Sequence, residues 1–176
     1  MVILRADENH WYRPVITTFD EQTGFVLAHV DKIDYGYRER SIRYQGMIFQ
    51  PKPELHITII SKDAGILLKH LKRHPDHADD LQDLIVSTNW SFRRLDKIYF
   101  IQEKPGVEAI VQMVEIPVLQ GFLKDLSRLV GHGLVIPPTH ITLYWRGMEK
   151  GIAIPDNQSF QKLVKAQIQL GEVRAA

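Results

Sequence analysis

Two copies of the tripeptide His-Ile-Thr carry the residues of this chain that are best suited to chemistry. They lie at His56–Thr58 and His140–Thr142, and an aliphatic residue follows each threonine. Histidine exchanges protons near neutral pH, because its unperturbed pKa is about 6.5, and a threonine hydroxyl donates hydrogen bonds to anions. Two such pairs around one phosphodiester would supply an acid, a base and two hydrogen-bond donors.

Each copy is expected to begin a β-strand. Prolines precede the first copy at Pro51 and Pro53 and the second at Pro137 and Pro138, and a proline favours extended backbone in the residue before it. Side chains two positions apart in a strand share a face, so the histidine and the threonine of each copy point the same way.

The repetition exceeds what composition explains. A scrambled chain with this composition would contain roughly 0.3 His-x-Thr matches. The plain alternative is two unrelated strand histidines whose rings complete hydrogen bonds in the core. In that case the chain is a scaffold, and the two histidines lie far apart or are buried separately.

Strand alternation extends each motif beyond its threonine. On the face of the second motif lie Tyr144 and Arg146, and on the face of the first lies Lys62. Tyr144 is a candidate for stacking on a base, and Arg146 and Lys62 are candidates for contacting a neighbouring phosphate. The alternative, that these side chains are simply solvated or structural, stays open.

The paired motifs resemble the signature of the two-histidine (2H) phosphoesterase superfamily, which is two His-hydrophobic-Thr-hydrophobic strands several tens of residues apart. Eight residues carry the resemblance, His56–Ile59 and His140–Leu143, and 84 residues separate the histidines (140 − 56). The resemblance implies the RNA-ligase-like, cyclic phosphodiesterase fold. It also implies His56 and His140 as the acid and base, with Thr58 and Thr142 as phosphate ligands.

Members of this superfamily open cyclic nucleotide phosphates or act on 2′,5′-linked phosphodiesters at RNA ends without a metal. We therefore expect a metal-independent phosphodiesterase, a hydrolase of a 2′,3′-cyclic phosphate or a 2′,5′-linkage in a nucleotide or RNA end. Ring strain and a single alkoxide leaving group suit two imidazoles, so no metal and no cofactor are expected. The alternative is a non-catalytic module that binds a nucleotide or RNA end in the same cleft.

Composition limits the remaining possibilities. A chain of 176 residues with 44% hydrophobic content has the length of one domain, so residues 1–176 are expected to form a single bilobal domain. Lys and Arg number 22 against 21 Asp and Glu, so a polyanion must be recognised locally. There is no cysteine to act as a nucleophile. Neither a signal peptide nor a membrane span is expected, and we predict a cytoplasmic monomer without a membrane partner.

The order of predicted elements indicates an α+β fold with two pseudo-symmetric lobes. Each lobe would be an antiparallel sheet with outer helices, and the lobes would flank a central cleft, as the resemblance also implies. A hairpin is expected around residues 20–24, another around 104–106, and a loop over 31–43. Expected strands span residues 13–19, 25–30, 44–49, 95–102, 108–115, 139–145 and 166–170, and expected helices lie around 66–71 and 81–85, over 117–130 and over 157–165.

Other patterns are weaker. His70, His74 and His77 have helix-like spacing, but Pro75 interrupts the helix, so an exposed helix end is favoured over a metal site. Residues 35–43 mix tyrosines with arginines, as single-stranded nucleic acid favours, although a solvated loop is the preferred interpretation. The chain has no Gly-x-Ser-x-Gly elbow, phosphate-binding loop or dinucleotide motif. Members of the superfamily usually place the first motif nearer the start, whereas 55 residues precede His56 here.

Overall fold

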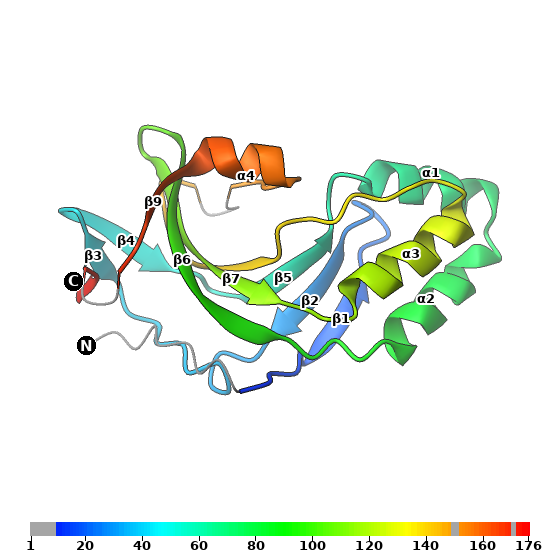
Figure 1. The fold of residues 1–176 in the computed structure, drawn as a ribbon, viewed down its shortest axis with the longest axis horizontal. Helices are drawn as coiled ribbons and strands as arrows, with labels where there is room; N and C mark the ends of the chain where they lie inside the picture. The colour runs from blue at the N-terminus through cyan, green and yellow to red at the C-terminus, as the bar shows by residue number, and fades with distance from the viewer. Residues whose placement is uncertain (1–9, 149–151, 170–171) are drawn as a thin grey trace.

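A computed structural model describes residues 10–148, 152–169 and 172–176 (Figure 1). This part of the chain contains ten strands and four helices, and all of its strand pairings are antiparallel, which confirms the α+β class. The strands are β1 (Ile16–Phe19), β2 (Val26–Val30), β3 (Ile42–Tyr44), β4 (Met47–Pro51), β5 (Leu55–Ile60), β6 (Arg93–Lys104), β7 (Val107–Glu115), β8 (His140–Arg146), β9 (Val164–Gln167) and β10 (Arg174–Ala175). The helices are α1 (Ala64–Arg73), α2 (His77–Ser87), α3 (Leu119–Val130) and α4 (Asn157–Leu163).

The strands form one open sheet that branches at β8. Strands β1, β2, β5 and β8 follow one another in space, and β8 then pairs with β7, which leads to β6 and β9. The C-terminal end of β8 also pairs with β4, which continues into β3 and β10. One edge of β8 therefore holds β7, and the other edge is shared by β5 and β4.

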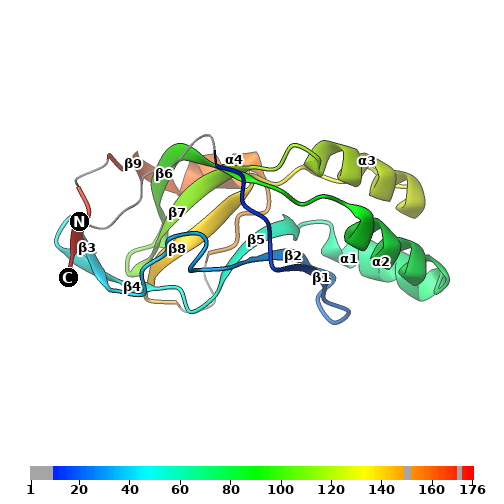
Figure 2. The same cartoon turned by 90° about the horizontal axis from the view of Figure 1, so that it is seen from below.

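Three of the helices gather at one end of the molecule. Figures 1 and 2 show α1, α2 and α3 together beside β1, β2 and β5, whereas α4 lies apart and contacts β6. Pro75 separates α1 from α2, and α3 ends at Gly131 in the left-handed conformation, both as predicted. None of the helices among the described residues has the length and apolar character needed to cross a membrane.

The first hairpin, between β1 and β2, is confirmed and presses against α1. Gly24 has a φ of +77°, and a Cβ atom at this position would lie 2.5 Å from the Ala64 carbonyl oxygen. Only glycine fits such a close approach of two backbones. The second predicted hairpin, between β6 and β7, is also present.

Two boundary predictions were wrong. Residues 44–49 do not form one strand, because Gln45 and Gly46 both have positive φ (48° and 79°) and make a two-residue turn between β3 and β4. The expected loop at 31–43 accordingly ends in β3. Near the C-terminus, β9 starts at Val164 directly after α4, earlier than predicted. The predicted end of that strand, Leu170, lies outside the described residues.

The apolar core has two parts on opposite faces of the sheet. The larger cluster includes Ile110, and the smaller includes Val111. Because neighbours in a strand point to opposite faces, β7 separates the two clusters. The smaller cluster also contains Ile152, Ile154 and Phe160, so the segment leading into α4 covers this second face.

Candidate active site

The four motif residues line one cavity of about 340 Å³. The polar lining residues of this cavity are His56, Thr58, His140 and Thr142 together with Lys52 and Ser61. The apolar lining residues are Phe25, Leu27, Ile152, Ala153 and Ile154. Two segments 84 residues apart in the sequence (140 − 56) therefore present their imidazoles and hydroxyls to the same space.

The pairing of β5 with β8 explains why the motifs meet. Ile57 and Ile141 are direct partners in the antiparallel register, and both are 0% exposed in the larger core cluster. Neighbours in a strand point to opposite faces, so the residues that flank these isoleucines point away from that core and into the cavity. Burial of the central isoleucine thus orients the histidine and the threonine of each motif.

The register also crosses the two motifs. Because the strands run in opposite directions from the isoleucine pair, His56 lies next to Thr142, and Thr58 lies next to His140. Each imidazole therefore has a hydroxyl from the other strand as its neighbour. A twofold rotation about the isoleucine pair would place each histidine on the position of the other, and likewise each threonine.

The His140 ring is fixed by a hydrogen bond to the backbone. Its Nδ1 lies 2.8 Å from the Pro138 carbonyl oxygen. Since a carbonyl only accepts, Nδ1 carries the hydrogen, and in the neutral ring Nε2 is the acceptor. Burial lowers the pKa of His140, and the bond to Pro138 opposes this shift.

The His56 ring has a more positive environment. Burial lowers the pKa of His56, and the nearby Lys52, His29 and His140 lower it further, whereas Glu54 opposes them. The His29 and His56 ring centroids are 6.5 Å apart. The two motif histidines thus resemble each other in burial and differ in the charges around them.

The lining of the cavity is suited to an anion. Among the described lining residues, none is acidic, and the polar ones are donors or titratable imidazoles. The Thr58 and Thr142 side chains are half-buried, and within the described residues their hydroxyls have no hydrogen-bond partner. They are therefore available to donate to a bound oxyanion.

Tyr144 lies in the core, because β8 contains a β-bulge directly after the second motif. Neighbouring residues of β7 pair with Thr142 and Tyr144, which leaves Leu143 as the extra residue. A bulge interrupts the alternation of faces, and Tyr144 packs in the larger core cluster, 1% exposed. Burial raises the pKa of its hydroxyl to about 12. Tyr144 does not line the cavity, so the geometry gives no support to stacking of a base on it.

Arg146 and Lys62 are held in ion pairs outside the cavity. Arg146 Nη1 donates to Glu108 Oε2 at 2.7 Å, and Lys62 Nζ donates to Asp156 Oδ2 at 2.6 Å. Neither residue is among those that line the cavity. Both candidates for phosphate contact therefore have structural roles in this conformation.

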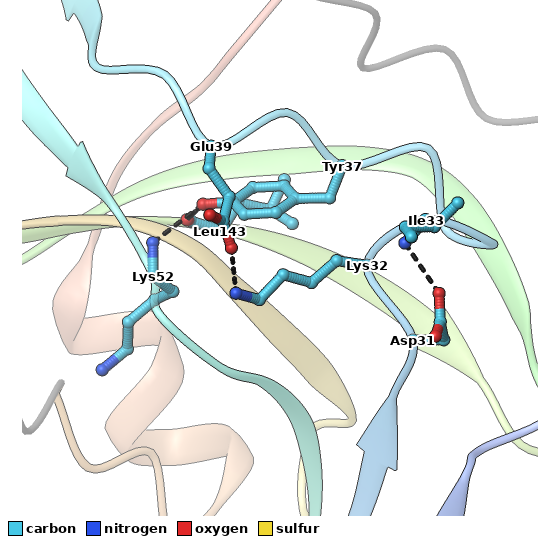
Figure 3. Close-up of polar contacts among 7 residues, drawn as sticks. All are labelled: Asp31, Lys32, Ile33, Tyr37, Glu39, Lys52 and Leu143. Carbon is cyan, nitrogen blue, oxygen red and sulfur yellow. Dashed lines mark hydrogen bonds and ion pairs between the residues drawn. The ribbon is translucent and has the colours of Figure 1, made fainter.

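Lys52 is the charged lining residue that sequence reasoning missed. Its backbone N–H lies 3.0 Å from the Leu143 carbonyl oxygen and 2.8 Å from the Tyr37 hydroxyl oxygen, which accept it (Figure 3). The side chain runs away from these two contacts and is 7% exposed. The only signal in the sequence was a charged residue between two prolines, four positions before His56.

The weaker patterns have structural explanations. The rings of His70, His74 and His77 contact one another, with centroids 4.8 to 5.3 Å apart, on the ends of α1 and α2. No cluster in the described part of the chain has the arrangement of a metal site. Of the aromatic residues at 35–43, Tyr35 is buried and its hydroxyl donates to Gln112 Oε1 at 2.8 Å.

Comparisons with known proteins add no relative. Neither a protein-family model, nor a curated protein, nor a solved structure matches this chain.

Proposed function

We propose that this protein is a metal-independent phosphodiesterase that hydrolyses a 2′,3′-cyclic phosphate or a 2′,5′-linkage of a nucleotide or RNA end. One observation carries the proposal: His56, Thr58, His140 and Thr142 all line one cavity. A volume of about 340 Å³ is at the lower end of ligand pockets. It suits one nucleotide unit at the site of reaction.

The proposed reaction needs one base and one acid. A water oxygen forms a bond to phosphorus, and the bond from phosphorus to a ribose oxygen breaks. One imidazole accepts the proton of the water, and the other donates a proton to the departing ribose oxygen. The products are a phosphate monoester and a free ribose hydroxyl, and proton exchange with solvent restores both imidazoles.

The threonines and the bound phosphate complete this scheme. The Thr58 and Thr142 hydroxyls donate hydrogen bonds to the non-bridging oxygens, where charge increases in the transition state. Burial lowers the pKa of both histidines, so both are mainly neutral near pH 7 before substrate binds. A phosphate anion favours the charged form of an adjacent imidazole. Substrate binding thus creates the acid by taking up one proton.

We also propose that the domain is bilobal, with this cavity as its central cleft. The crossed register around Ile57 and Ile141 supports a pseudo-twofold relation, because it exchanges His56 with His140. Each lobe would then contribute one motif strand. A substrate phosphorus between the strands would face one imidazole on either side.

The apolar lining residues of the cavity are suited to contact a nucleoside. Phe25 is 37% exposed and lines the cavity with Ile152 and Ile154. A partly exposed aromatic ring beside an anion site is a suitable surface for a base to stack on. We assign to Phe25 the stacking contact for which Tyr144 was a candidate from the sequence.

Hydrolysis of 2′,3′-cyclic nucleotides in excess chelator tests the proposal. The wild type should open them, and His56→Gln and His140→Gln should each abolish turnover while near-UV circular dichroism stays unchanged. His132→Gln is the matched control, because His132 is exposed after α3 and does not line the cavity. Inactivity on cyclic mononucleotides, cyclic-ended oligonucleotides and 2′,5′-linked dimers alike would contradict the proposal.

One observation favours the alternative of a binding module. Burial lowers the pKa of both motif histidines, which disfavours the charged imidazole that the acid role needs. If bound phosphate does not reverse this, the cavity binds a nucleotide without an acid to release the leaving group. Tight binding of a 2′,3′-cyclic nucleotide with no product after long incubation would identify this case.

A further inference from the structure

Lys52 brings a third cationic group to the cavity. Its side chain is buried and lines the same space as both motif histidines. Its backbone is held in place, because the amide N–H is accepted by the Leu143 carbonyl and the Tyr37 hydroxyl. Leu143 is the bulged residue that directly follows Thr142, so this anchor ties Lys52 to the end of the second motif (Figure 3).

The charge of Lys52 lowers the pKa of His56 and is not among the influences on the pKa of His140. The charged and titratable groups that act on His56 are Lys52, His29, His140 and Glu54, and three of these four lower its pKa. For His140, the opposing influence on the buried ring is the Pro138 carbonyl, which favours the protonated form. The charges around His56 therefore disfavour a proton there, whereas the Pro138 carbonyl favours one on His140.

We propose that Lys52 binds the substrate phosphate and, through its charge beside His56, makes His56 the general base and His140 the general acid. This inference rests on the proposed function, because it assigns roles within the same reaction. The His140 ring suits the acid role, since its Nδ1 hydrogen is already held by Pro138 and its Nε2 is the atom that carries the transferred proton.

Each proton in the assigned step has a donor and an acceptor. A proton taken up on binding lies on His140 Nε2, and the His56 ring is neutral. As the water oxygen bonds to phosphorus, its proton passes to His56, and His140 transfers its proton to the ribose oxygen that leaves phosphorus. Lys52 keeps its proton throughout and stabilises the charge on the non-bridging oxygens together with the threonines.

Direct titration of the histidines by NMR tests the charge effect without any need for turnover. In Lys52→Met, the pKa of His56 should rise, whereas that of His140 should change less. Lys52→Arg, which keeps the charge, should stay close to the wild type. The control is Lys124→Met, which removes an exposed lysine of α3 and should move neither pKa. An unchanged His56 pKa in Lys52→Met, or equal shifts of both histidines, would overturn the assignment.

Binding and turnover test the contact with phosphate. Calorimetry with inorganic phosphate should show affinity about tenfold weaker or worse in Lys52→Met, as for loss of one hydrogen bond to a charged group. In turnover assays, the acidic limb of the kcat/KM profile should move to higher pH in the same variant. Wild-type turnover with no change in Lys52→Met would refute the role of Lys52 and leave the proposed function intact. Absence of wild-type turnover would instead refute the function and, with it, the acid and base roles.

Discussion

The two motif strands are equivalent over four residues and different beyond them. Both strands have one extra residue directly after the threonine, Ile59 in β5 and Leu143 in β8. They differ in their surroundings, because β5 leads into α1 whereas β8 follows α3. Their shared stretch is the part that faces the cavity on one side and the core on the other. The near-symmetry of this site therefore stops at the reacting groups, because the charge of Lys52 lowers the pKa of His56 and the Pro138 carbonyl raises that of His140.

Removing one imidazole at a time tests whether the two motif strands have different roles in the reaction. We expect turnover to fall by about 10² to 10⁴-fold in each of His56→Gln and His140→Gln, the usual contribution of a general acid or base. The pH profile should differ between them. Without the base the acidic limb of kcat/KM should disappear, and without the acid the alkaline limb should disappear.

The control for this pair is His132→Gln, which should retain both limbs and full turnover. Loss of the same limb in both variants would show that the two strands do not divide the acid and base roles.

The isoleucine pair tests whether the strands are equivalent in packing. Ile57→Ala and Ile141→Ala should each lower the free energy of unfolding by about 2 to 5 kcal/mol, because both side chains are fully buried. Ile57→Val and Ile141→Val are the matched small changes, with an expected cost of about 0.5 to 1.5 kcal/mol. Urea unfolding followed by circular dichroism measures all four, and a cost at only one strand would show that their packing is unequal.

Of two aromatic residues near the motifs, Phe25 lines the cavity and Tyr144 packs in the core. Phe25→Ala should weaken nucleotide binding by about 1 to 3 kcal/mol, the range for a lost stacking contact, and leave binding of inorganic phosphate unchanged. Tyr144→Phe should leave both affinities unchanged, because Tyr144 lies in the core. Calorimetry with a 2′-nucleotide and with phosphate distinguishes them. Weaker nucleotide binding in Tyr144→Phe alone would restore the stacking role to Tyr144.

The smallest expected effect is on the pH dependence of stability. Both motif histidines have a lowered pKa in the folded protein. Between that lowered pKa and the unfolded value of about 6.5, the unfolded chain binds more protons, so the free energy of unfolding rises with pH. This stability is fully present above about pH 6.5 and is lost as the pH falls through the folded pKa.

Urea unfolding at several pH values between about 5 and 8 measures this effect. The double variant His56→Gln/His140→Gln should have a flatter dependence than the wild type, while His132→Gln should keep the wild-type slope. If the free energy of unfolding depended on pH equally in the double variant and the wild type, protonation of these two rings would not destabilise the folded protein.

Local sequence was sufficient to predict features that depend on a single strand or helix. The prolines before each motif, the break at Pro75 and the end of α3 at Gly131 all act within a few residues, and the structure has them where predicted. The common face of each histidine and threonine follows from strand geometry alone. That the two motifs line one cavity required the β5 and β8 pairing, which the repetition of the motif only implied.

Long-range pairing decided the features that the sequence did not reveal. The bulge at Leu143 arises where β8 pairs with both β7 and β4, so it moved Tyr144 into the core against simple alternation. The Lys52 backbone amide is held by Tyr37 and Leu143, which are 106 residues apart. The turn at Gln45 and Gly46 did have a local signal, since glycine inside an apparent strand weakens that interpretation.

The Tyr37 hydroxyl has one further consequence. It accepts a hydrogen bond from the Lys52 amide and donates one to the Leu143 carbonyl. It therefore links the segment that precedes the first motif to the residue that follows Thr142 in the second. The loop that carries this tyrosine belongs to the segment upstream of β5. Replacing that loop, although it contributes no group to the lining of the cavity, would loosen the two motif strands at the point where they converge.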